Sequence, residues 1–210
     1  MNKKRMITIS ASIFIVLIAF GVLLTTHSSK IEEPNKINNA NAKVGHTNLD
    51  ANRTLVIYFT ESANTYILAN IISDEVGGDL RILEPVNSYP SGEELKTLIK
   101  EERDNDIRPE FKDLNIHMSD YDTIFIGYPI WAYTMPMMLY TFFDEYDLSG
   151  KTIIPFNTHE GTGNGGTYET IKSLEPNAKV LNGLSINDSA FETDQSARVK
   201  SWFKELGILS

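Results

Sequence analysis

Residues 55–65 read LVIYFTESANT, and this stretch decides how the chain folds. An apolar, β-type run ends at Phe59 in a short polar loop, which leads directly into a helical pattern. The first N–H groups of a helix have no partner within the helix, and the helix dipole favours an anion at this end. Thr60, Ser62 and Thr65 add hydroxyl donors, and the loop contains no Lys or Arg. The stretch therefore predicts a phosphate-binding loop that holds its ligand with neutral dipoles, unlike the lysine-containing Walker loop.

Apolar runs alternate with helical patterns along the whole chain from Arg53 onward. Strands are expected at residues 54–59, 80–83, 123–127, 152–156 and 179–184, and helices at 63–75, 92–104, 136–146, 168–174 and 194–206. Runs such as Ile124-Phe125-Ile126 show no polar alternation, which is typical of strands buried on both faces. The order βαβαβαβαβα predicts an α/β fold with a doubly wound, five-stranded parallel sheet and helices on both of its faces.

Two later segments also place a polar or glycine-rich loop after an expected strand. Residues 121–131 read YDTIFIGYPIW, and residues 150–163 read GKTIIPFNTHEGTG. Together with residues 55–65, and in this order, they resemble the flavodoxin family, whose phosphate loop reads Thr/Ser-x-Thr-Gly-x-Thr. Two positions depart from the family pattern: Ala63 stands at the loop glycine, and Glu160 stands where glycine is often found.

The resemblance implies a flavodoxin-like fold with the strand order 2-1-3-4-5. It also implies FMN, bound non-covalently beyond the carboxyl ends of strands 1 and 3. Three loops are expected to hold it: the phosphate loop (residues 60–65), the first ring loop (129–133) and the second ring loop (158–163). No side chain is expected to be catalytic, and the scattered histidines predict no metal site. The implied cofactor-binding residues are Thr60, Glu61, Ser62, Ala63, Asn64, Thr65, Pro129, Ile130, Trp131, Ala132, Tyr133, Thr158, His159, Glu160, Gly161, Thr162 and Gly163.

A flavin ring needs apolar or aromatic faces and backbone hydrogen bonds at its pyrimidine edge. Trp131 and Tyr133 are expected to supply the faces, and the second ring loop is expected to cover the edge. His159 lies at the mouth of the site, where it either donates to the reduced flavin or simply faces solvent. We expect the flavin to have acidic surroundings without a nearby Lys or Arg, and such surroundings would disfavour an anionic reduced flavin and lower its potential.

A dinucleotide-like pattern begins in the second ring loop and runs three residues beyond it. Residues 161–166 read GTGNGG, which satisfies Gly-x-Gly-x-x-Gly, and Asp188 follows about twenty residues later. A dinucleotide fingerprint should open a βαβαβ half, yet only one further strand and helix follow. We therefore interpret the glycines as a loop whose backbone can closely approach a flavin ring.

The N-terminus has the pattern of a membrane-targeting segment. Lys3, Lys4 and Arg5 precede an uncharged run over residues 7–26, whose length suits a membrane span better than a signal-peptide core. Residues 1–26 are therefore predicted to be a membrane anchor with the following domain outside the cytoplasm, or alternatively a signal peptide whose cleavage releases a secreted protein. Residues 27–52 are polar and Asn-rich, which predicts a disordered linker before a domain at residues 53–210.

Composition excludes several classes of function. Residues 51–210 carry 13 Lys and Arg against 25 Asp and Glu, and such an acidic domain repels nucleic acid. The chain has no cysteine, which excludes disulfides and thiolate chemistry. Three functions are left open: an FMN electron carrier with a redox partner protein, an NAD(P)H-dependent FMN oxidoreductase of quinones or other small acceptors, and a binding module that has lost flavin.

Overall fold

A computed structural model describes residues 47–210 of the chain. The predicted membrane anchor or signal peptide (residues 1–26) and most of the predicted linker (residues 27–46) lie outside the described residues. Within residues 47–210, none of the helices combines the length and apolar character needed to cross a lipid bilayer.

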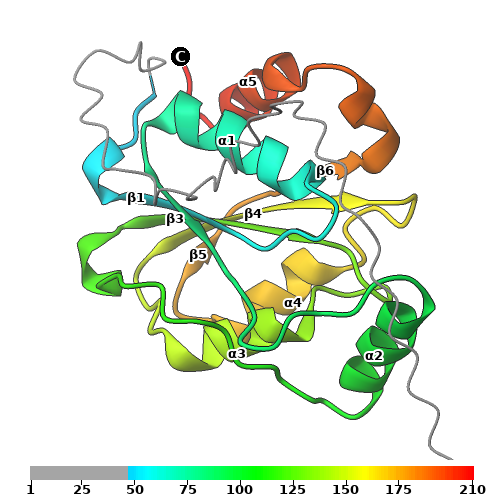
Figure 1. Cartoon of the computed structure of the whole chain (residues 1–210). Helices are drawn as coiled ribbons and strands as arrows, with labels where there is room; N and C mark the ends of the chain where they lie inside the picture. Colours follow the sequence, from blue (N-terminus) through cyan, green and yellow to red (C-terminus); the bar gives the residue numbers. More distant parts are fainter. Residues whose placement is uncertain (1–46) are drawn as a thin grey trace, which may run out of the picture. The chain divides into compact units, whose positions relative to one another are not determined.

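The described residues form a parallel sheet flanked by helices (Figure 1). The strand order β2-β1-β3-β4-β5 confirms the predicted 2-1-3-4-5 topology, and every strand pair is parallel. The elements are β1 (Thr54–Tyr58), α1 (Asn64–Val76), β2 (Asp79–Ile82), α2 (Glu93–Asp104), β3 (Thr123–Pro129), α3 (Met137–Glu145), β4 (Thr152–His159), α4 (Thr167–Leu174), β5 (Lys179–Val180), β6 (Leu184–Asn187) and α5 (Ser196–Glu205), with short 3₁₀ helices η1 (Ala51–Arg53), η2 (Met118–Asp120) and η3 (Asp188–Glu192).

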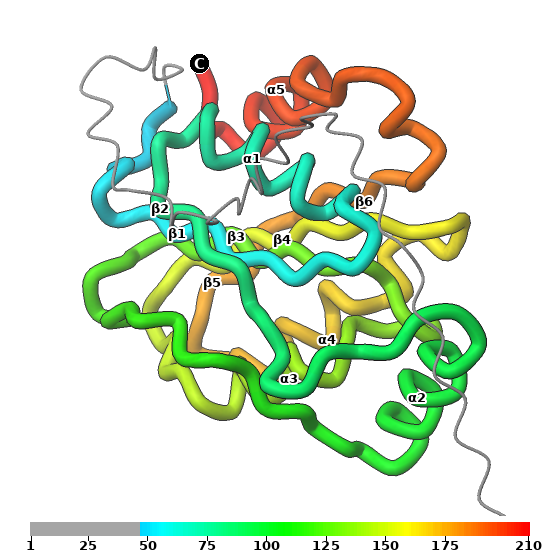
Figure 2. Tube along the Cα trace, viewed as in Figure 1, coloured from blue at the N-terminus to red at the C-terminus, as the bar shows by residue number. Residues whose placement is uncertain are grey.

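Alternate strand residues form two separate cores, one on each face of the sheet. Leu55 and Ile57 of β1 face the core beneath α3 and α4, whereas Val56 faces the core beneath α1 and α5. Figure 2 shows these helix pairs on opposite sides of the strands. A Cβ on Gly127 of β3 would lie 2.1 Å from the ring of Phe156, so glycine at this position leaves room for that buried ring. The uniformly apolar strands therefore match a sheet that is covered on both faces.

The predicted fifth strand is broken into β5 and β6, which pair with the start and the end of β4. Opposite the break lies Pro155, which has no N–H to donate to a neighbouring strand. A Cβ on Gly183 would lie 2.5 Å from the Pro155 carbonyl oxygen and 2.4 Å from the ring of Tyr168. The break carries the chain past this crowded point, and β6 then continues beside β4 as far as His159.

The end of the predicted linker packs against the domain. Thr47 forms an antiparallel bridge with Leu209, the Asn48 N–H donates to the Ile208 carbonyl at 2.8 Å, and Leu49 packs against the core beneath α1 and α5. Residues 47–52 therefore belong to the folded unit rather than to a linker. Their contacts are mostly with backbone groups near the C-terminus, which leave no periodic pattern in the sequence.

We expect deletion of residues 1–46 to leave a cooperatively folding domain, and deletion of residues 1–52 to lower its free energy of unfolding by about 2 kcal/mol. The longer deletion removes the packing of Leu49 and the hydrogen bonds of Asn48. Urea denaturation of the two truncated chains measures the difference. Equal stability of both would show that residues 47–52 contribute nothing to the fold.

Candidate functional site

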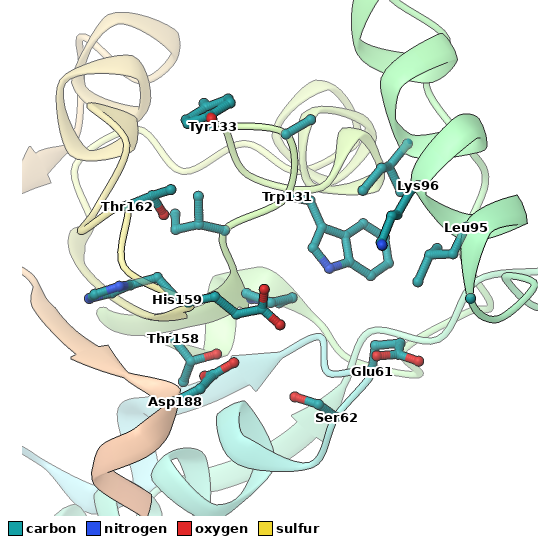
Figure 3. Close-up of a pocket in the computed structure, with 16 residues that line it drawn as sticks. Glu61, Ser62, Leu95, Lys96, Trp131, Tyr133, Thr158, His159, Thr162 and Asp188 are labelled. Atoms are coloured by element: carbon teal, nitrogen blue, oxygen red, sulfur yellow. The ribbon is translucent and has the colours of Figure 1, made fainter.

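A cavity of about 410 Å³ opens where the loops after β1, β3 and β4 meet (Figure 3). All three loops follow the carboxyl ends of parallel strands, the edge at which doubly wound sheets bind ligands. All five residues of the first ring loop line the cavity. The remaining predicted site residues that line it are Glu61, Ser62, Thr158, His159, Glu160 and Thr162. Thr60, Ala63, Asn64, Thr65, Gly161 and Gly163 belong to the same loops but do not line it.

The phosphate loop ends at the N-terminus of α1. Ala63 is the N-cap residue and adopts a left-handed conformation, with φ of 70°, so alanine occupies the backbone geometry that glycine usually provides. Thr65 is buried, and its Oγ1 lies 2.9 Å from Oγ1 of the buried Thr158, which joins this loop to β4. The Oγ1 of Thr60 is also covered but has no hydrogen-bond partner among the described residues.

We expect Ala63→Gly to raise the free energy of unfolding by about 1 kcal/mol, because glycine relieves the left-handed strain of a residue with a Cβ. Chemical denaturation of the ligand-free protein measures the change. A loss of stability instead would mean that the greater chain entropy of glycine outweighs the strain at this position.

The first ring loop is a tight hairpin. Trp131 and Thr134 exchange two backbone hydrogen bonds, of 2.8 and 2.9 Å. The two residues at the tip of the hairpin, Ala132 and Tyr133, have φ values of 46° and 67°. In most proteins a turn of this geometry has the sequence Asn-Gly. Arg103 of α2 holds the hairpin from one side through a 2.8 Å bond from Nη1 to the Ala132 carbonyl, while Ile130 N donates to the Thr158 carbonyl at 2.8 Å. The surrounding structure therefore holds this strained turn in place.

Trp131 packs within an aromatic cluster and also lines the cavity. Its ring meets those of Phe59 and Tyr89 nearly edge-on, with centroid distances of 5.0 and 4.9 Å. Tyr133 lines the cavity as well but is 74% exposed. Trp131 is therefore a fixed wall, whereas Tyr133 is free to adjust to a ligand. The other tryptophan, Trp202, lies in the core against Phe125.

The second ring loop continues directly from β4, which extends three residues beyond its predicted end. The Gly161 N–H donates to Nδ1 of His159 at 2.9 Å, so a neutral His159 carries its proton on Nε2. A Cβ on Gly165, two residues beyond the second ring loop, would lie 2.8 Å from the Tyr133 carbonyl oxygen, so the chain that leaves the second ring loop lies against the first ring loop. The glycines thus allow a close approach between loops.

The structure adds residues that the sequence reasoning missed. Gly92, Leu95, Lys96 and Ile99, at or in α2, form one further wall, and Asp188 lies at the start of η3. In Figure 3, Leu95 and Lys96 lie on the same side of the cavity as Trp131. Lys96 therefore places a cation at the cavity wall. Its Nζ donates a 2.6 Å hydrogen bond to Glu93, and this ion pair raises the pKa of Lys96. The expectation of a site without nearby Lys or Arg is wrong to that extent.

Sequence comparison identifies the family. The family model described as Flavodoxin matches residues 53–206. The chain belongs to the flavodoxin family. No curated protein sequence matches it.

Solved structures support the same fold for this flavodoxin. A protein of Bacteroides eggerthii, assigned as a flavoprotein, is 27% identical with a TM-score of 0.63, over 72% of this chain and 96% of its own. A protein of Bacteroides uniformis with the same assignment is 25% identical, with a TM-score of 0.64. The match covers 74% of this chain and 99% of that protein. The flavoprotein of Lactobacillus acidophilus in complex with FMN shares the fold and is 21% identical, with a TM-score of 0.58. The match covers 68% of this chain and 97% of that protein.

A buried carboxyl group lies behind the aromatic wall of the site. Glu102 of α2 is 4% exposed, and its Oε2 accepts a 3.1 Å hydrogen bond from the Tyr89 hydroxyl. Burial raises the pKa of Glu102, and the Tyr89 bond only partly opposes this. Burial and the nearby Glu102 carboxylate also raise the pKa of Tyr89. Glu102 and Tyr89 thereby connect α2 to the ring of Trp131.

We expect Glu102→Gln to stabilise the protein at neutral pH. The pKa of Glu102 is higher in the folded than in the unfolded state, so folding takes up a proton between the two values and stability falls as pH rises through this window. Glutamine keeps an oxygen for Tyr89 and carries no charge. Denaturation at several pH values should show a stabilisation that shrinks towards the unfolded pKa of about 4.3. A pH-independent difference would refute the assignment.

Proposed function

We propose that this flavodoxin binds FMN non-covalently in the cavity and acts as an electron-transfer protein. The observation that carries the proposal is the convergence of the phosphate loop and both ring loops on one cavity. Its volume of about 410 Å³ lies within the usual range of small-ligand sites, about 300–1,000 Å³. The FMN complex of the Lactobacillus acidophilus flavoprotein and the family membership support the choice of cofactor.

The residues present fit a phosphate. The loop ends at a helix N-terminus with free N–H groups, and Thr60 Oγ1 is a buried hydroxyl that lacks a partner among residues 47–210. A phosphate oxygen would accept from this hydroxyl. The hydroxyl of Ser62, at the cavity wall, is a further donor.

The residues present also fit the flavin ring. Trp131 offers a fixed aromatic surface and Tyr133 an adjustable one, and the backbone of residues 158–163 offers polar groups for the pyrimidine edge. Bound FMN would supply one- and two-electron chemistry. The chain would hold it, orient it and set its electrostatic environment, with Glu61, Glu160 and Asp188 outnumbering Lys96 at the cavity wall.

A second function, NAD(P)H-dependent reduction of a quinone or another small acceptor, is favoured by one observation. Leu95 and Ile99 of α2 add an apolar wall beyond the three family loops. Such a wall would accept an apolar acceptor beside the flavin, which a carrier that meets only protein partners would not need.

We further propose that this chemistry takes place at the extracytoplasmic face of a membrane. The support is the basic and then apolar N-terminal sequence, with the alternative that cleavage releases a secreted form. The acidic domain would then steer a basic redox partner by electrostatic attraction.

Steady-state turnover of the FMN-loaded full chain with NADH or NADPH and a quinone separates the two functions. A carrier should give no turnover without a protein partner but should be reduced by dithionite and reoxidised. Rapid turnover with nicotinamide and quinone alone would reject the carrier in favour of the enzyme.

A further inference from the structure

A row of polar side chains crosses the sheet just below the second ring loop. Asn157 of β4 pairs in register with Tyr128 of β3 on one side and with Ser185 of β6 on the other. Tyr128 belongs to the core beneath α3 and α4, and both Tyr128 and Asn157 are fully buried. The next two residues of β4, Thr158 and His159, line the cavity (Figure 3). The polar row is therefore the last layer of this core before the site.

Asn157 is the centre of the row, and its side-chain amide is bonded on every side. Its Oδ1 accepts a 2.7 Å hydrogen bond from the hydroxyl of Tyr168 in α4. Its Nδ2 donates to Ser185 Oγ at 3.0 Å and to the Gly163 carbonyl at 3.4 Å. Because a carbonyl only accepts, the amide nitrogen must face the loop. Burial raises the pKa of Tyr168, so its hydroxyl keeps the proton that it donates.

A second chain of hydrogen bonds holds the next carbonyl of the backbone. The Tyr128 hydroxyl lies 2.8 Å from Oγ1 of the buried Thr167, and this Oγ1 donates to the Asn164 carbonyl at 2.7 Å. Two consecutive carbonyls, those of Gly163 and Asn164, are thus bonded to buried side chains. In a trans peptide the N–H points opposite to the C=O, so the N–H groups that follow these two carbonyls point away from their buried partners.

The segment that these bonds hold is rich in glycine. Residues 161–166 contain four glycines, and φ is positive at every one of them. A segment of this composition has many accessible conformations unless other parts of the protein restrain it. Apolar side chains could fill the space of the polar row without any donor or acceptor to satisfy, whereas a fully bonded polar network fixes one arrangement. The row therefore serves to fix the conformation of the loop above it.

We infer that Asn157 and Tyr168 are positioning residues for flavin binding, which hold the second ring loop in the conformation that receives the pyrimidine edge of the ring. The inference rests on the proposed function, in which this loop covers that edge. Neither side chain lines the cavity: Tyr168 acts through Asn157, and Asn157 acts through the Gly163 carbonyl. A loop that is ordered in advance loses less conformational entropy when the ligand binds, so binding is tighter.

Two ligands report on the pyrimidine edge: FMN, and 3-methyl-FMN, in which a methyl group replaces the hydrogen on ring nitrogen 3. The wild-type chain should bind FMN at least about tenfold more tightly, because a fixed loop offers that hydrogen an acceptor and leaves no room for a methyl group. In fluorescence titrations of the full chain, Tyr168→Phe should weaken FMN binding about threefold or more and change 3-methyl-FMN binding by less than about twofold. Phenylalanine keeps the ring that lies beside Gly183 and removes only the hydroxyl.

Tyr121→Phe is the matched control. It also removes a buried tyrosine hydroxyl with a 2.8 Å hydrogen bond, to Asp79, but Asp79 lies at the start of β2, at the opposite edge of the parallel sheet from the cavity. This variant should lose a similar amount of stability while its affinities for both ligands stay unchanged. Asn157→Leu should show the effect of Tyr168→Phe more strongly, because the Gly163 carbonyl then loses its donor. Tyr168→Phe is the milder change and decides the test if Asn157→Leu does not fold.

Equal weakening of FMN and 3-methyl-FMN binding by Tyr168→Phe, or no change in either, would overturn the inference and leave the proposed function intact. A wild-type chain that binds the two ligands equally tightly would do the same. A wild-type chain that binds neither ligand would overturn both.

Discussion

Trp131→Ala should weaken the binding of FMN and of riboflavin by similar factors, equivalent to roughly 2–4 kcal/mol. Trp131 is the aromatic wall of the cavity, held by Phe59 and Tyr89, so its loss removes both contact area and a fixed surface for the ring. Riboflavin has no phosphate, and a residue that contacts only the ring acts on both ligands alike. Flavin that still binds should fluoresce more brightly, because a stacked indole quenches its emission.

Trp202→Ala is the matched control. Trp202 lies in the core between α5 and the sheet, so we expect its truncation to cost about 3–5 kcal/mol of folding stability without a selective effect on flavin emission. If Trp131→Ala leaves affinity and fluorescence unchanged in a folded protein, the ring does not lie against Trp131.

Thr60→Val should act in opposite directions on stability and on FMN binding. The hydroxyl of Thr60 is covered and unpartnered among the described residues, so its replacement by a methyl group should stabilise the ligand-free protein by about 1 kcal/mol. FMN binding should nevertheless weaken by about 1–3 kcal/mol, because the phosphate loses a donor. Riboflavin binding should stay unchanged.

Thr65→Val provides the contrast within the same loop. It breaks the 2.9 Å bond to Thr158 and leaves that cavity residue without its partner, so stability and the affinity for both flavins should fall together. Calorimetric unfolding and titrations with both flavins distinguish the two variants. If Thr60→Val lowers riboflavin and FMN affinity equally, the phosphate does not bind at Thr60.

The sequence predicts those parts of the fold that depend on the pattern of residues within one continuous segment. Strand β1, the phosphate loop and α1 form one continuous segment, and its apolar run and helical pattern suffice to place all three. The broken fifth strand could not be predicted in this way, since it depends on Pro155 and Tyr168 meeting Gly183 across the sheet. The packing of residues 47–52 could not be predicted for a related reason, since these residues pair with backbone groups at the other end of the chain.

In the site, too, the residues in local motifs could be predicted, whereas those brought there by long-range packing could not. Each of the three loops follows its own strand, so the topology alone brings them together. Leu95 and Lys96 reach the cavity only because α2 is held there through Glu102 and Arg103. In the sequence, α2 is a charged helix with a short apolar stripe, and this pattern does not indicate that the helix lines a cavity. Asp188 did have a sequence signal, the spacing from the glycine-rich loop, but its position at the cavity depends on β6 lying beside β4.

Titration of the full chain with FMN, followed by absorbance and by flavin fluorescence, tests the central claim most directly. One cavity built from the three loops predicts saturation at one FMN per chain, a perturbed absorption band and quenched emission, with weaker binding of riboflavin. A spectrum that remains that of free FMN at every ratio of protein to flavin would contradict the account.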